Sequence, residues 1–219
     1  MNFTNQSIKK SKGQSNHKVI ADNRNMSVLL IEDQPNTGSP LKKALTDFDY
    51  HVTKQISLND NIMAEIELCN PDMLILAIDL PSEHVLKDLA EINKLLPLPI
   101  IIFAENDSLS VIQNAIKAGV SAYVVHELFP QRINSIISVA NERFKEVQAL
   151  RNELKLAKTQ LESRKLIERA KGHIMQLKQV NENEAYGALR KMAMDQGTPI
   201  AMVAKNIIDV YELLSTPNV

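Results

Sequence analysis

Two carboxylates stand side by side directly after a short apolar run near the start of the chain. Residues 28–31 form the run, and Glu32 and Asp33 follow it. Carboxylate oxygens are the ligands that hard divalent cations such as Mg²⁺ prefer. This pair could therefore bind a divalent cation weakly. The alternative is that it is simply two solvated carboxylates at the end of a strand.

Cationic side chains gather near the other end of the chain. The group consists of Arg164, Lys165, Arg169 and Lys171, followed by Arg190 and Lys191. Such side chains contact phosphates and stack on splayed bases in nucleic-acid complexes. Residues 162–219 carry eight Lys or Arg against seven Asp or Glu, so the contact must come from a focused patch. The alternative is a solvated helix face held by pairs one turn apart.

The composition favours an ordinary cytoplasmic protein with a core of aliphatic residues. The chain has 219 residues, 44% of them hydrophobic, no Trp, a net charge of −1 and a single cysteine. No stretch approaches the roughly 18–20 apolar residues of a membrane span, so we expect no membrane contact. No nucleophile–base pair or metal cluster is evident, and we therefore do not expect an enzyme. Residues 1–25 are polar and basic, which is typical of a disordered tail or a weak electrostatic arm, unless Met26 is the natural start.

Residues 26–130 alternate between strand and helix patterns. Continuous apolar runs at 28–31, 74–78, 100–103 and 123–125 are typical of strands buried on both faces, and 51–53 fits a further strand. Helical spacing of apolar residues lies between them. This alternation predicts a flavodoxin-like α/β domain with a parallel sheet covered on both faces.

A long helix is predicted from about Gln131 to Lys178, with the linker part at 131–161. Its apolar residues repeat with 4-3 spacing, at Ile136, Ala140, Val147, Leu150, Leu154, Ala157 and Leu161. This spacing favours a coiled coil with a second subunit, and intramolecular antiparallel packing is the alternative. Residues 162–219 then predict a small three-helix, all-α domain. Asn181 or Asn183 is expected to cap its second helix, and Pro199 to open its third.

The first domain resembles the response-regulator receiver domain, over roughly 27–143. The resemblance rests on the sequence LLIED at 29–33 and PDMLIL at 71–76. In that family the acidic pair holds Mg²⁺, and an Asp, a Thr or Ser, and a Lys complete the phosphorylation site. Those three positions fall on Ala77, Ala104 and His126. The resemblance therefore implies a pseudo-receiver without a phosphoacceptor. Asp79 lies two residues out of register, so we expect it to be a loop residue before Pro81 rather than a substitute.

The last domain resembles the ANTAR domain, and the chain as a whole resembles the AmiR/NasT group of antiterminators. The matching elements are AKGHIM at 170–175, LRKMAM at 189–194 and Val203-Ala204. The resemblance implies a protein that binds paired stem-loops in leader mRNA and is controlled by a ligand-sensing partner protein or by phosphorylation. Ala77 favours the partner protein, and the predicted coiled coil would make the protein a dimer.

Some residues of this domain have two interpretations from the sequence alone. Gly172 and Ala170 allow close approach either of RNA or of a neighbouring helix. Tyr186 could stack on a base or lie at the core edge. At the level of the whole protein, the alternatives are a DNA-binding response regulator and an interaction or scaffold protein without nucleic acid. No cofactor is expected beyond weak Mg²⁺ at Glu32 and Asp33.

Overall fold

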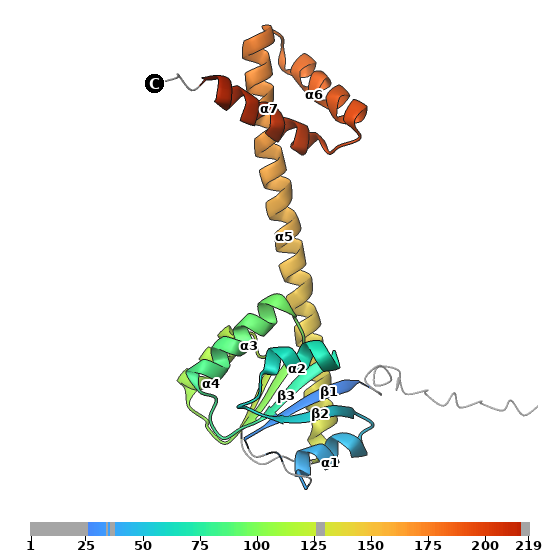
Figure 1. Cartoon of the computed structure of the whole chain (residues 1–219), viewed down its shortest axis with the longest axis vertical. Helices are drawn as coiled ribbons and strands as arrows, with labels where there is room; N and C mark the ends of the chain where they lie inside the picture. The colour runs from blue at the N-terminus through green and yellow to red at the C-terminus, as the bar shows by residue number, and fades with distance from the viewer. Residues whose placement is uncertain (1–25, 34, 36–37, 126–129, 216–219) are drawn as a thin grey trace, which may run out of the picture. The chain divides into compact units, whose positions relative to one another are not determined.

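The computed structural model describes residues 26–33, 35, 38–125 and 130–215 (Figure 1). The chain divides into two compact units, a sheet unit up to Glu146 and a helical unit from Val147 onward. One long helix contributes residues to both units. The predicted tail at 1–25 lies outside the described residues. No described helix combines the length and the apolar character needed to cross a bilayer.

The sheet unit contains five parallel strands in the order β2-β1-β3-β4-β5. The strands are β1 (Ser27–Glu32), β2 (His51–Ser57), β3 (Met73–Ala77), β4 (Ile100–Ala104) and β5 (Ala122–Val125). Every predicted strand is present, and β2 continues four residues past the predicted end at Thr53. Because the strand order reverses beside β1, the sheet is doubly wound, which confirms the predicted α/β class.

Helices cover both faces of this sheet. They are α1 (Pro40–Asp47), α2 (Ile62–Cys69), α3 (Glu83–Leu95), α4 (Leu109–Lys117) and the start of α5 (Ile133–Lys178). Leu29 and Ile31 of β1 pack in the core under α2, α3 and α4. Val28 and Leu30 pack in the opposite core, with α1 and α5. The alternation follows from strand geometry, since successive side chains point to opposite faces.

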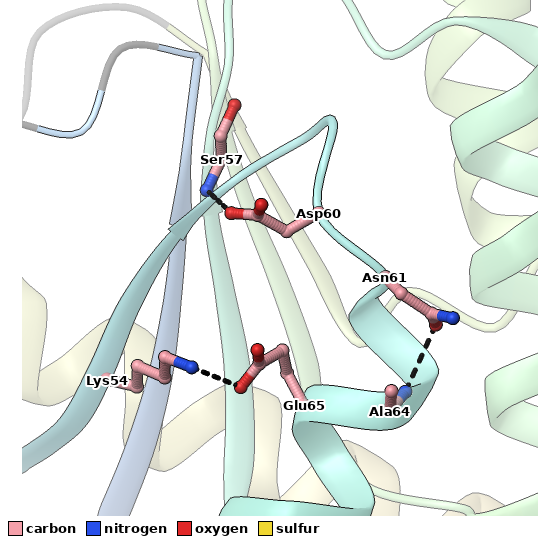
Figure 2. A network of polar contacts seen from close by, with 6 residues as sticks. All are labelled: Lys54, Ser57, Asp60, Asn61, Ala64 and Glu65. Atoms are coloured by element: carbon pink, nitrogen blue, oxygen red, sulfur yellow. Dashed lines mark hydrogen bonds and ion pairs between the residues drawn. The ribbon is translucent and has the colours of Figure 1, made fainter.

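The connection from β2 to α2 is held by its own polar side chains (Figure 2). The backbone N–H of Ser57 donates to an Asp60 carboxylate oxygen at 2.8 Å. Asn61 caps α2 by accepting a backbone N–H of its first turn. Lys54 on β2 lies 2.7 Å from Glu65 on α2 and ties the strand to the helix. These contacts account for the polar residues of this corner as turn and cap elements.

The helix α5 runs for 46 residues without a break. Ile133, Ile137 and Ala140 are fully buried in the core of the sheet unit. Ala140 therefore belongs to that core rather than to a free seam. The seam residues of the helical unit are exposed, with Val147 45%, Leu150 58%, Leu154 56% and Leu161 55% accessible.

The helical unit is completed by α6 (Glu182–Gln196) and α7 (Ile200–Ser215). Asn181 caps α6 in a capping box with Glu184, which confirms one of the two predicted caps. Gly197, with φ of +61°, ends the helix. The prediction that Pro199 is the first residue of the third helix was wrong by one residue. The helix begins at Ile200, and the Pro199 carbonyl accepts the N–H groups of Met202 at 2.9 Å and Val203 at 3.3 Å, so Pro199 directly precedes the helix.

A separate small core joins the three helices of this unit. Its buried members come from the end of α5 and from the facing sides of α6 and α7: Ala170, Ile174, Ala185, Leu189, Ala193, Val203, Ala204 and Ile208. Four of these eight residues are alanines, whose small side chains suit close packing of helices.

Candidate functional site

Glu32 lies at the carboxyl edge of the sheet, at the end of β1, and is only 8% exposed. One carboxylate oxygen accepts the hydroxyl of Ser39 at 2.5 Å, and the other accepts the side-chain amide of Gln55. Ser39 also caps α1 by accepting the backbone N–H of Lys42 at 3.2 Å. Both oxygens of Glu32 are therefore engaged by donors of the protein itself, which link β1, β2 and the start of α1.

Asp33 is exposed and makes a different contact. Its Oδ2 accepts the backbone N–H of Asp79 at 3.0 Å, so it fastens the segment that follows β3. Among the residues that the structure describes, no three His, Cys, Asp or Glu side chains are grouped to hold a metal ion. A cation at the predicted weak site of Glu32 and Asp33 would share these carboxylates with hydrogen bonds that stabilise the edge of the sheet.

The two alanines expected at the phosphorylation positions occupy the same edge. Ala77 ends β3 and pairs in register with Glu32 on one side and Phe103 on the other. Ala104 ends β4 and pairs with Val125. A methyl group offers neither a nucleophile nor a hydrogen-bond donor for a phosphoryl group. His126 lies outside the described residues.

A cleft of about 730 Å³ opens elsewhere in the sheet unit, between α2 and α3. Its apolar floor includes Ile62, Val85 and Ile92, and Asp60 and Asp88 stand among its polar residues. Neither the acidic pair nor either alanine lines it. This cleft therefore adds nothing to the chemistry of the sheet edge.

Two of the predicted cationic residues tie the helices of the helical unit together. Lys171 of α5 is only 7% exposed, and its ammonium lies 2.8 Å from Glu168 and 2.6 Å from Glu182. The ammonium donates hydrogen bonds to Glu168 and Glu182, of which the one to Glu168 has the larger effect, and both raise the pKa of Lys171. The hydrogen bond from Lys171 in turn lowers the pKa of Glu182. Arg169 lies 2.7 Å from Glu212 and joins α5 to α7.

The other predicted cations are exposed, and they are Arg164, Lys165, Arg190 and Lys191. Within the described part of the chain none of these four has an ion pair or hydrogen bond. Arg190 and Lys191 lie on α6, which turns back from the end of α5 (Figure 1). Both side chains are exposed, so an anionic group outside the helical unit could reach them.

Gly172 and Ala170 have different surroundings in the structure. Ala170 is fully buried in the helical core, so its small size serves helix packing. A Cβ added at Gly172 would meet no atom within 4 Å, and the same holds for Gly187 on α6. Internal packing therefore does not require glycine at either position. Each leaves bare helix backbone open to a molecule outside the helical unit.

Tyr186 is 45% exposed on α6. Arg190 and Met194 follow it at intervals of four residues, so the three side chains form one outward row. An aromatic ring, a guanidinium and a thioether in one row offer stacking surfaces beside a positive charge. The sequence alone left the position of Tyr186 open, and the structure places it at the surface.

Sequence reasoning missed a second aromatic contact. His173 and Tyr211 stack with their ring centroids 3.9 Å apart, joining the end of α5 to α7. The Tyr211 hydroxyl also donates to Gln176 at 3.4 Å. The two rings stand 38 positions apart in the chain, and no local pattern connects them. Their role in this structure is to hold the helices in place.

Residues 28–138 of the chain, about half of its length, match the family of response regulator receiver domains. The chain belongs to this receiver family. Residues 156–208, which span the end of α5, all of α6 and most of α7, match the ANTAR domain. The protein is accordingly a transcriptional regulator of the response-regulator type with an ANTAR domain, in a class of proteins that regulate rather than catalyse.

Several known proteins are similar to all or part of the chain. The transcriptional regulatory protein PdtaR of Mycobacterium tuberculosis is 28% identical over 190 residues, which are 87% of this chain and 91% of the relative. The nitrate regulatory protein of Klebsiella oxytoca is 36% identical over 78 residues, or 36% of this chain and 20% of the relative. A CheY-like receiver domain protein of Methanospirillum hungatei has a TM-score of 0.48 at 22% identity, covering 56% of this chain and 98% of its own.

Proposed function

We propose that this protein is an RNA-binding transcription antiterminator, which recognises paired stem-loops in leader mRNA through its ANTAR domain. One observation carries the proposal. The exposed cations Arg164, Lys165, Arg190 and Lys191, which have no partner among the described residues, lie on α5 and α6 within the residues that match the ANTAR domain. Leader transcripts are made in the cytoplasm, so the proposed function places the protein there.

The side chains around these cations suit looped RNA better than duplex DNA. Sequence-specific RNA binding uses unstacked bases, which stack on aromatic rings and on guanidinium groups. Tyr186 and Arg190 supply both in one row, and the bare backbone at Gly187 leaves space beside them. Duplex DNA is read by a helix that inserts base-contacting side chains into the major groove. The exposed row of α6 offers a single guanidinium for that purpose, between a ring and a thioether, and no amide.

A binding experiment tests the proposal. Purified protein, freed of any inhibitory companion, is titrated with a two-stem-loop RNA, a single stem-loop and a duplex DNA at stated salt concentrations. We expect the two-stem-loop RNA to bind most tightly and the duplex DNA most weakly. Tighter binding of duplex DNA would favour the DNA-binding alternative. Failure to bind any of the three at low salt would favour the alternative that this is an interaction protein that binds no nucleic acid.

The receiver domain, in our proposal, is a pseudo-receiver controlled by a ligand-sensing partner protein rather than by phosphorylation. Three features of the sheet edge support this. Ala77 and Ala104 have no reactive groups, and both oxygens of Glu32 are already bonded to Ser39 and Gln55. A phosphoryl group would therefore find no nucleophile at Ala77, and a cation would share the Glu32 carboxylate with Ser39 and Gln55.

Incubation with Mg²⁺ and acetyl phosphate is expected to leave the mass of the intact protein unchanged. The physical reason is the absence of a carboxylate at position 77, because the Asp79 side chain stands two residues further along, about 7 Å on an extended chain. Intact-mass spectrometry checks this, with a phosphorylatable response regulator as the positive control in the same buffer. A stable acyl-phosphate adduct on this chain would overturn the pseudo-receiver proposal.

We further propose that the protein is a homodimer through the seam of α5. Val147, Leu150, Leu154 and Leu161 are each about half exposed, and their 4-3 spacing places them on one side of the helix. An apolar stripe of this length is normally covered by a partner helix. Two ANTAR domains in one dimer could then engage two stem-loops of the same transcript, and the second contact would gain from effective concentration.

A further inference from the structure

Lys171 differs from the neighbouring cations of α5 in burial and in its partners. It is 7% exposed, whereas Arg164 and Lys165 are exposed. Its ammonium lies between Glu168, one turn earlier on the same helix, and Glu182, the first residue of α6. The contact with Glu182 therefore crosses the turn from one helix to the next.

The contact between Lys171 and Glu182 constrains how α6 lies on α5, which the turn residues alone do not. The chain leaves α5 at Lys178, turns at Gln179 with φ of +53°, and restarts at the capping box of Asn181. These local features define where α6 begins. Lys171 lies seven residues before the end of α5, about 10 Å along the helix axis. A contact at that distance from the turn fixes how the first turn of α6 lies on α5.

The direction of α6 matters because its exposed row carries the residues proposed to meet RNA. Arg190 lies eight residues beyond Glu182, about 12 Å along α6. A change of angle at the first turn therefore moves Tyr186 and Arg190 by amounts that grow along the helix. Binding groups need to be held within about 0.5 Å and 10–20° of their productive geometry.

We propose that Lys171 is a positioning residue, which anchors the start of α6 on α5 through Glu182 and does not itself contact RNA. This inference rests on the proposed function. A phosphate could recruit the Lys171 ammonium only by displacing two carboxylates at 2.6 Å and 2.8 Å from a side chain with little accessible surface. Lys165, six residues earlier and exposed, serves as the matched contact residue on the same helix.

The salt dependence of RNA binding separates a positioning residue from a contact residue. A lost phosphate contact lowers the slope of log K against log salt by about 0.7 to 0.9. We expect Lys165→Gln to lower the slope by this amount in the full-length protein with the two-stem-loop RNA. We expect Lys171→Gln to weaken binding at every salt concentration while the slope stays unchanged. An equal loss of slope in both variants would overturn the inference.

For Glu182→Gln, an anchoring role and a simple charge effect predict opposite changes in RNA affinity. Glu182 is 66% exposed, so this variant should fold normally. Removal of a negative charge would tighten RNA binding if only net charge mattered, but we expect weaker binding because α6 loses its anchor. The charge-swapped double variant Lys171→Glu with Glu182→Lys should recover affinity relative to either single change. Recovery in the swap would support the anchor despite the nearby Glu168. Tighter binding by Glu182→Gln would contradict the inference.

A measurement without RNA keeps this inference separate from the proposed function. Amide hydrogen exchange reports local opening of a helix. We expect exchange in the first turns of α6 to become several-fold faster in Lys171→Gln and Glu182→Gln, and to stay unchanged in Lys165→Gln. If that pattern appears while the wild-type protein binds no RNA, the proposed function fails and the anchoring role stands. Unchanged exchange in all three variants would refute the anchor itself.

Discussion

Replacement of both Arg190 and Lys191 by alanine is expected to weaken binding of the two-stem-loop RNA by about a hundredfold near 0.1 M salt, since each lost phosphate or base contact costs roughly tenfold. The two side chains are exposed on α6 and have no partner among the described residues, so their loss leaves the fold intact. The slope of log K against log salt should fall by about 1.4 to 1.8, because two cations no longer release counterions.

The matched control removes two exposed lysines from the sheet unit, Lys87 on α3 and Lys117 on α4. It changes the net charge by the same amount as the α6 variant. Circular dichroism should show the same helix content in both proteins. If the control variant loses as much affinity as the α6 variant, the net charge of the protein governs binding and a focused ANTAR surface is ruled out.

The double change Leu154→Lys and Leu161→Lys is expected to convert the protein from dimer to monomer. These residues are 56% and 55% exposed and lie seven positions apart, so both face the same partner helix in the proposed coiled coil. Two lysines facing two lysines would repel one another across an apolar interface and would be expensive to desolvate. Sedimentation velocity measures the resulting mass directly.

The same variant should affect RNA binding selectively. Binding to the two-stem-loop RNA is expected to fall by roughly 10² to 10⁴, the usual gain from linking two sites, while binding to a single stem-loop stays unchanged. Leu156→Lys is the control, because Leu156 is 63% exposed but lies off the 4-3 stripe. A wild-type protein that is already monomeric, or a double variant that remains dimeric, would reject the seam as the interface.

The fold of the sheet unit could be read from short-range patterns. A strand buried on both faces must be apolar at every position, and residues 28–31, 74–78 and 100–103 satisfy this without exception. The capping box at Asn181 and the exposed seam of α5 are equally local, since the interacting residues lie within a few positions of each other. Ala77 and Ala104 could be assigned to the phosphorylation positions from local sequence as well, because each is the last residue of a recognisable strand.

Only the tertiary structure determines which of the cations pair with carboxylates and which stay exposed. By type and spacing Lys171 is equivalent to Lys165, and Arg169 to Arg164. Yet Lys171 reaches Glu182 across a turn, and Arg169 reaches Glu212, which is 43 residues away. Long side chains can bond to any carboxylate that the fold brings within reach, and which carboxylate that is depends on how α6 and α7 pack on α5. Likewise, the partners of Glu32 come from α1 and β2, so the sequence determined that a carboxylate ends β1, and only the packed structure determined that its oxygens are already in use.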